Sequence, residues 1–217
     1  MKYIYLMLLF CSAALHVHAQ KSSNKEGTVT IMAGYDIGAY GLEHYMWQDG
    51  NELFGRTGNA LTSNAVVSIQ MGVLEMLSIG VSGSFGNYYE DPLYVGKSGS
   101  IYYSAAGDVR FYLANYPYFN WYVGGLLGLS TLSLSNDDDK GRAVEILYRG
   151  PYMGITNGLH WYFSSSFGVN FALVFSNMQF RLDNYTIDGD IQSTPGLSSS
   201  VNGMGVHVRF GVSYKLY

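Results

Sequence analysis

The sequence predicts an all-β protein, an eight-stranded antiparallel up-and-down β-barrel that spans a membrane through its strands. Three observations predict this class. Apolar and polar residues alternate in one stretch after another, the connections between the stretches alternate in length, and charge is confined to one parity of each stretch. A period of two is typical of β-strands whose two faces meet different surroundings. Alternating connection lengths are typical of hairpins whose long loops all lie at one end.

Eight alternating stretches follow one another along the chain. They lie at 28–39, 63–73, 77–87, 100–113, 118–132, 143–163, 167–178 and 201–216. The connections are tight at 74–76, 115–117 and 164–166, of medium length at 133–142, and long at 40–62, 88–99 and 179–200. We therefore expect antiparallel neighbours, with the long loops outside the cell and the tight turns in the periplasm.

The N-terminal segment MKYIYLMLLFCSAALHVHAQ has the features of a secretory signal peptide. We predict cleavage after Ala19. Residues 1–19 then form the signal peptide, residues 20–27 a polar lead-in and residues 28–217 the barrel. A short N-terminal membrane anchor is the alternative. The only cysteine, Cys11, falls within the signal peptide, so the mature chain is expected to form no disulfide.

The composition argues against a soluble domain. Charged residues make up 13% of the chain, about half of the share usual in soluble domains, while aromatic residues reach 16%. A secreted soluble β-protein, which needs a charged outer surface, is therefore the least favoured alternative. The net charge of −4 gives no reason to expect a nucleic-acid partner.

The two parities of the strands differ in charge. Outside the stretch 143–163, no position on the apolar parity is Asp, Glu, Lys or Arg. A charge that faces lipid at mid-depth costs roughly 2 to 4 kcal/mol, so we predict that this parity contacts lipid. The other parity should line a narrow lumen, with Asp36, Asn64, Gln70, Asp108, Arg110, Asn170, His207, Arg209 and Lys215. One buried ion network is expected among four of these residues, namely Asp36, Asp108, Arg110 and Arg209.

The stretch 143–163 does not keep this pattern along its whole length. If the apolar parity of Trp161 and Leu159 is continued toward lower residue numbers, it places Pro151 and Arg149 toward lipid. We therefore predict a β-bulge at Gly150–Pro151 that turns Arg149 inward and Tyr148 outward. The alternative is an unbroken strand whose Arg149 lies above the membrane.

The last stretch, VHVRFGVSYKLY, ends on an aromatic residue. With the signal peptide and four hairpins, the chain resembles, over residues 28–217, the small eight-stranded outer-membrane β-barrel proteins of the OmpX and OmpA-barrel kind, without a periplasmic domain. The resemblance implies a location in the cell outer membrane, contact with outer-membrane lipid, and insertion by the barrel-assembly machinery, and it carries over no catalytic residue or cofactor. In one departure, Tyr217 is out of phase with Tyr214, so the terminal signal is imperfect.

Side chains fill a lumen of eight strands, which argues against a general diffusion pore. An acyl hydrolase or acyltransferase would need a nucleophile, a histidine base and an orienting acid. His160 points inward near Ser164 and Ser166, but no acid accompanies it. We expect His44 and His207 to be hydrogen-bonding residues of a loop and of the lumen. No catalytic, cofactor-binding or metal-ligating residue is therefore predicted.

Exposed loops on a rigid barrel are where recognition usually occurs. Loops 40–62 and 179–200, which carry aromatic and polar clusters, are the predicted contacts for an extracellular ligand or surface partner. The acidic run at 137–139, in loop 133–142, is expected to be a solvated tip, with a cation site as the alternative. The sequence thus predicts a non-enzymatic outer-membrane protein with a structural or surface-interaction role. A lipid-modifying acyl hydrolase or transferase on the same barrel is the alternative.

Overall fold

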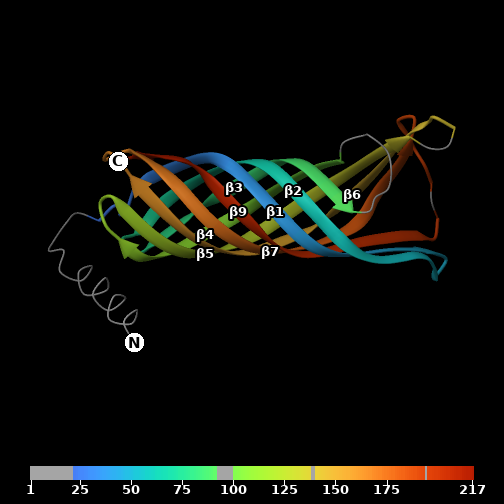
Figure 1. The fold of residues 1–217 in the computed structure, drawn as a ribbon, viewed down its shortest axis with the longest axis horizontal. Coiled ribbons are helices and arrows are strands. Elements are labelled where there is room, and N and C mark those ends of the chain that lie inside the picture. Colours follow the sequence, from blue (N-terminus) through green and yellow to red (C-terminus); the bar gives the residue numbers. More distant parts are fainter. Residues whose placement is uncertain (1–21, 92–99, 138–139, 194) are drawn as a thin grey trace.

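The computed structural model describes residues 22–91, 100–137, 140–193 and 195–217. Eight long strands close into a barrel, and a very short additional strand lies at one tip (Figure 1). The strands are β1 (Val29–Gln48), β2 (Asn51–Leu74), β3 (Leu77–Asp91), β4 (Ser100–Asn115), β5 (Phe119–Asp137), β6 (Ala143–Tyr162), β7 (Phe167–Ile187), β8 (Asp190–Ile191) and β9 (Leu197–Leu216). In the described parts of the chain, no helix is long and apolar enough to cross a membrane.

The long strands form one antiparallel ring. Hydrogen-bonded neighbours run in the order β6, β5, β4, β3, β2, β1, β9 and β7, and β6 pairs with β7 to close the ring. The first and last strands pair along their whole length, from Val29 opposite Leu216 to Gln48 opposite Leu197. The predicted eight-stranded up-and-down barrel is confirmed.

The alternation in the sequence sorts the side chains to the two faces of the wall as predicted. In β7, Phe167, Phe171 and Phe175 are exposed on the outside, whereas Ala172 and Val174 are buried inside. The predicted luminal residues are all buried: Asp36, Asn64, Gln70, Asp108, Arg110, Asn170, His207, Arg209 and Lys215. The apolar parity therefore covers the outside of the barrel.

The outward-facing large apolar residues form what we call the apolar belt. The belt starts at the tight turns and ends, on successive strands, at Ile37, Leu61, Tyr89, Ile101, Leu129, Met153, Phe175 and Met204. On β7 it runs from Phe167 to Phe175, which is close to the 9 to 11 residues with which a tilted strand crosses a bilayer. Because β7 has 21 residues, about half of it continues beyond the belt.

The region beyond the belt, made of the described residues within 41–60, 131–150 and 177–202, is called here the outer half. It lies at the end of the barrel opposite to the C-terminus (Figure 1). Its outward-facing residues are mostly polar or charged, such as Glu43 and Gln179, both of them exposed. The outer half is therefore a continuation of the barrel wall whose surface suits water rather than lipid.

The long loops predicted at 40–62 and 179–200 are largely strand, so this part of the prediction is wrong. β1 and β2 stay paired up to the two-residue turn Asp49–Gly50, and β7 ends at a similar turn, Asp188–Gly189. All four turn residues have positive φ, between 52° and 86°. Two-residue hairpin turns of this kind favour Asp-Gly because glycine adopts positive φ without strain.

The predicted bulge at Gly150–Pro151 is also wrong. Tyr148 is fully buried inside the barrel and Arg149 is exposed outside, so β6 keeps one phase throughout. Proline has no N–H to donate, and no residue of β7 is paired with Gly150 or Pro151, yet the register on either side is unchanged. The register shift between β6 and β7 lies nearby, between Leu147 and Tyr148, where Asp183 of β7 has no residue of β6 opposite it in the strand pairing. Arg149 lies above the belt, as the alternative expected.

The polar lead-in, described from residue 22 onward, closes the end of the barrel that carries the tight turns. The Asn24 N–H donates to Asn115 Oδ1, and Asn115 Nδ2 donates to the Asn24 carbonyl, both at 2.8 Å. The Asn24 side chain also donates to the Leu74 carbonyl at 2.8 Å. The Lys215 ammonium, inside the lumen, donates to the Ser23 hydroxyl. The lead-in is therefore a plug that joins two turns. The predicted signal peptide and its cleavage after Ala19 lie outside the described residues.

Candidate functional site

Two layers of side chains fill the lumen. Near the outer half, the interior is an apolar core rich in tyrosine, made of Tyr40, Leu42, Ala60, Tyr88, Tyr102, Ala106, Leu126, Leu132, Tyr148, Tyr152, Val174, Met178, Phe180 and Val201. Toward the tight turns, the interior is polar and holds the buried charges. Side chains are expected to fill a lumen of eight strands in this way.

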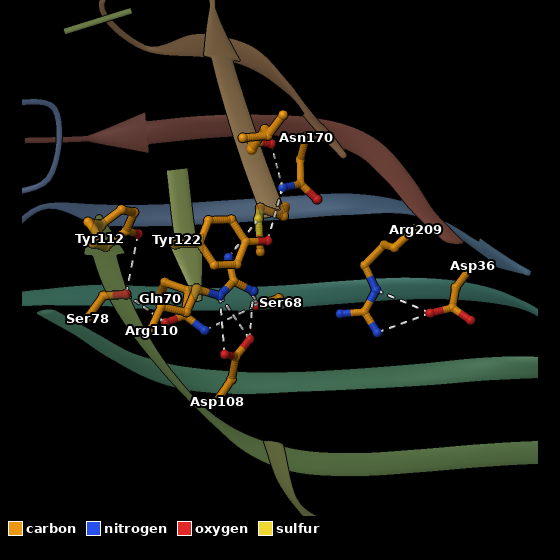
Figure 2. A network of polar contacts seen from close by, with 12 residues as sticks. Asp36, Ser68, Gln70, Ser78, Asp108, Arg110, Tyr112, Tyr122, Asn170 and Arg209 are labelled. Atoms are coloured by element: carbon orange, nitrogen blue, oxygen red, sulfur yellow. Dashed lines mark hydrogen bonds and ion pairs between the residues drawn. The ribbon is translucent and has the colours of Figure 1, made fainter. Parts of the chain in front are cut away.

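Arg110 and Asp108 form a fully buried ion pair in the polar layer (Figure 2). The distance from Arg110 Nη2 to Asp108 Oδ2 is 2.6 Å. The guanidinium carbon lies 4.6 Å from the centre of the Tyr122 ring, and Nη2 donates to the Ser68 hydroxyl at 3.4 Å. A buried charge is tolerated when it is paired and hydrogen-bonded. The Arg110 guanidinium thus contacts side chains of β4, β5 and β2, and these contacts link the three strands inside the lumen.

Asp36 and Arg209 form a second buried pair, separate from the first (Figure 2). Arg209 Nη2 lies 3.1 Å from Asp36 Oδ2. All four residues of the predicted network are thus buried and paired, but no hydrogen bond or ion pair joins the two pairs within the described residues. Because Asp108 and Arg110 are two residues apart on one strand, they face the same side and satisfy each other locally. Two separate pairs, one within β4 and one between β1 and β9, therefore replace the single predicted network.

His207 lies between Asp36 and a serine hydroxyl in the middle of the lumen. Its Nδ1 is 2.6 Å from Asp36 Oδ1, and its Nε2 is 2.8 Å from Ser176 Oγ. This order of acid, imidazole and hydroxyl is the one that serine hydrolases use. All three side chains are almost completely buried, however, and the Asp36 carboxylate is shared with Arg209. A nucleophile must reach its substrate, so here the arrangement is a structural hydrogen-bond network, as predicted for His207.

A looser arrangement of the same kind lies at the outer mouth of the lumen. His44 Nδ1 is 3.6 Å from Glu90 Oε1, and its Nε2 is 3.5 Å from Ser199 Oγ. The Ser199 hydroxyl donates to the Tyr45 carbonyl at 2.9 Å, so its hydrogen does not point at His44. A general base must accept the hydrogen of its nucleophile. The group, which Tyr148 joins at 3.2 Å from His44, ties four strands together at the mouth.

Sequence reasoning missed this mouth group because its members come from β1, β3, β6 and β9. The sequence pattern predicts loops at 40–62 and 88–99, whereas His44 and Glu90 lie on the strands β1 and β3. The signal that indicates them is the inward parity of β1 and β3, continued past the end of the apolar belt. Contacts across the lumen additionally require the strand register, which a single sequence does not supply.

The other sequence candidates do not assemble a site. His160 is buried in the lumen, where Nδ1 lies 2.8 Å from the Tyr162 hydroxyl. Ser164 and Ser166 lie in the exposed turn, where Ser164 Oγ accepts the Phe167 N–H at 3.0 Å. No contact joins either serine to His160 in the described chain. The three residues are therefore an internal hydrogen-bonding residue and two turn residues.

The candidate cation site in loop 133–142 falls largely outside the described residues, because positions 138 and 139 are not described and the side chain of Asp137 is not either. Elsewhere, in the part of the chain that the structure describes, no group of three or more His, Cys, Asp or Glu side chains is arranged to hold a metal ion.

Comparison with known proteins shows the fold. No protein-family model matches the sequence, and no curated protein sequence matches it. The crystal structure of the outer membrane protein OprG from Pseudomonas aeruginosa is 12% identical, covers 91% of this chain and 100% of OprG, and gives a TM-score of 0.65. The solid-state NMR structure of the outer membrane protein AlkL in DMPC lipid bilayers is 14% identical, covers 91% of this chain and 94% of AlkL, and gives a TM-score of 0.56.

At these identities the likeness establishes the fold alone. The chain has the fold of the small outer-membrane β-barrels, as its sequence predicts. The apolar belt is the surface through which a barrel of this fold contacts membrane lipid.

Proposed function

We propose that this chain is an integral outer-membrane protein without enzymatic activity, and that its outer half acts at the cell surface as a structural or surface-interaction element. One observation carries the proposal. On β1, β2, β5, β6, β7 and β9 the apolar belt covers only the part of the strand nearer to the tight turns, whereas the outer half has a polar exterior. A strand needs only about 9 to 11 residues to cross the bilayer, so the remainder stands in water above it.

The interior supports a role on the outside of the wall rather than in transport of large solutes. Tyrosines and aliphatic side chains fill the outer layer of the lumen, and two ion pairs with the plug fill the inner layer. β1 stays paired with β9 up to Gln48 without a register shift, and with β2 up to the Asp49–Gly50 turn with one register shift after Met46. The outer half is therefore a stiff surface, in contrast to a set of mobile loops.

Single cysteines test the orientation. The only natural cysteine, Cys11, lies in the predicted signal peptide, so the mature chain gives no background. Thr57→Cys, exposed on the outer half, should react with a membrane-impermeant maleimide on intact cells. Ser164→Cys, in a tight turn, should react only after the outer membrane is permeabilised. Labelling of Ser164→Cys alone on intact cells would reject the proposed surface role of the outer half.

A fluorophosphonate probe tests the absence of enzymatic activity against the alternative, an acyl hydrolase or transferase. Ser176 is aligned with His207 but sealed in the lumen, and Ser199 lies near His44 with its hydrogen on a backbone carbonyl. We expect no adduct on either serine of the folded barrel, as read by intact mass. An adduct on Ser199 that disappears in His44→Asn would establish the hydrolase instead.

A further inference from the structure

Two aromatic side chains lie next to each other on the outside of β1, in the outer half. Tyr45 and Trp47 share one parity, and their rings are nearly parallel, with centroids 5.5 Å apart and planes 21° apart. The apolar belt on β1 ends at Ile37, so the pair stands roughly 19 to 25 Å above the belt, by rise along a tilted strand. Aromatic girdles lie at the membrane interface. Contact with lipid headgroups therefore does not explain this pair.

The strand on one side of the rings provides space and a carboxylate. Gly55 of β2 lies opposite Tyr45, and a Cβ placed on Gly55 would approach Tyr45 Cδ1 to 2.9 Å. The same Cβ would meet the Glu52 carboxylate. The Tyr45 ring thus leans over the bare backbone of Gly55, and the carboxylate of Glu52 comes to the same place.

The strand on the other side provides hydroxyl groups. Ser200 and Ser198 of β9 lie opposite Tyr45 and Trp47 in the register, and they face outward with them. Within the described chain, the side chains of Glu52, Ser198 and Ser200 make no hydrogen bond. A partly buried aromatic pair on the outside of the wall is therefore flanked on both sides by polar groups that retain their full capacity to bind a ligand.

This combination matches the surface of a sugar. A hexose ring has an apolar face of C–H groups, which packs on an aromatic ring, and a rim of hydroxyl groups, which bond to carboxylates and hydroxyls. We propose that the face of β2, β1 and β9 around Tyr45 and Trp47, here called the aromatic platform, binds a neutral saccharide built of hexose units. The inference rests on the proposed function, because it requires the outer half to be at the cell surface.

The charges on the platform favour a neutral ligand over an acidic one. Glu43 and Glu52 are both exposed on this face and lie on two sides of the ring pair. Arg181 of β7 is one strand further, opposite Ser200. A sulfated or carboxylated saccharide placed on the rings would meet two carboxylates at short range, which is unfavourable. The platform is also open, so a single site is expected to bind weakly, with a Kd on the order of 1 mM.

The test uses the full mature barrel, folded in detergent micelles, and measures binding by calorimetry. The probes are maltohexaose, cellohexaose and chitohexaose, with dextran sulfate as the acidic counterpart. At least one neutral hexasaccharide should bind the wild-type barrel. Trp47→Ala should weaken that binding at least tenfold, and Ile191→Ala, which removes an exposed apolar side chain at the β8 tip, should leave it unchanged. Dextran sulfate should bind no more tightly than the neutral sugars.

Three results would overturn the inference: no neutral hexasaccharide bound at about 10 mM, equal binding by wild type and Trp47→Ala, or binding of dextran sulfate alone. Trp47→Cys separates this inference from the proposed function. If maleimide labels Trp47→Cys on intact cells but no saccharide binds, only the saccharide site is wrong. If Trp47→Cys is labelled only after permeabilisation, the surface role of the outer half is wrong as well.

Discussion

Asp36 and Arg209 lie opposite one another in the register of the first and last strands, and their side chains meet inside the lumen at 3.1 Å. The ion pair therefore lies on the seam where the barrel closes. A slip of one residue between these strands would turn one of the two charges toward lipid. Backbone pairing and side-chain pairing thus specify the same register at this seam.

Loss of the cation at the seam should destabilise the barrel. Arg209→Ala leaves Asp36 buried with only His207 beside it, so we expect the free energy of unfolding to fall by about 3 kcal/mol, near the lower end for broken buried pairs. Arg149→Ala is the matched control, because Arg149 pairs with Asp183 on the exposed outer surface, and it should cost less than about 1 kcal/mol. Urea unfolding followed by tryptophan fluorescence measures both. Equal losses would contradict a stabilising role for the seam pair.

Charge placed on the apolar belt should be costly, and the same charge above the belt should not be. Phe171→Arg puts a guanidinium at the middle of the belt on β7 and is expected to lower folding stability by roughly 2 to 4 kcal/mol in lipid. Gln179→Arg, outward on the same strand but in the outer half, should change it by less than about 0.5 kcal/mol. Refolding into lipid vesicles reports both values. A harmless Phe171→Arg would mean that lipid does not cover this face.

The plug should contribute to stability through one side chain. Asn24→Ala removes the hydrogen bonds to the carbonyls of the β2–β3 turn, and we expect a loss of about 1 to 3 kcal/mol. Ser22→Ala is the control, because Ser22 makes a single exposed hydrogen bond to Glu75, at 3.0 Å. Thermal unfolding of the two variants, compared with wild type, gives the difference. If both variants melt like wild type, the lead-in does not hold the turns together.

The part of the fold within the belt follows from the sequence because lipid outside and a packed lumen inside impose opposite demands on alternate residues. Phe171 and its neighbours therefore reveal both the strand and its orientation. The outer half lacks this contrast, since water outside tolerates Glu43 and Gly41 as readily as Tyr45. Only the Asp-Gly pairs at Asp49 and Asp188 indicate that these segments are hairpins. These turn residues fix the hairpins although the polar composition of the segments is typical of loops.

The strand β6 shows the limit of reasoning from proline. Pro151 in the sequence predicts a bulge, yet β6 loses only its pairing with β7 at Gly150 and Pro151 and keeps its phase. Arg149 is tolerated because it lies above the belt, a height that the sequence does not fix by itself. The contact of Asp36 with Arg209 was predictable because both lie on the luminal parity of the first and last strands, which pair when the barrel closes. The neighbours of His44 depend instead on contacts across the lumen.

The pairing of β1 with β9 also governs how the chain can fold. Val29 and Leu216 are paired although nearly the whole described chain separates them. The loop-closure entropy lost in bringing them together is offset only when the other residue pairs of β1 and β9 have also formed. A nascent chain can form its hairpins one at a time, but it cannot become a ring before the 20 residues of β9 have been made. Closure is therefore a late and cooperative event, and interrupted synthesis would leave open sheet edges on β1 and β7 that invite pairing with other chains.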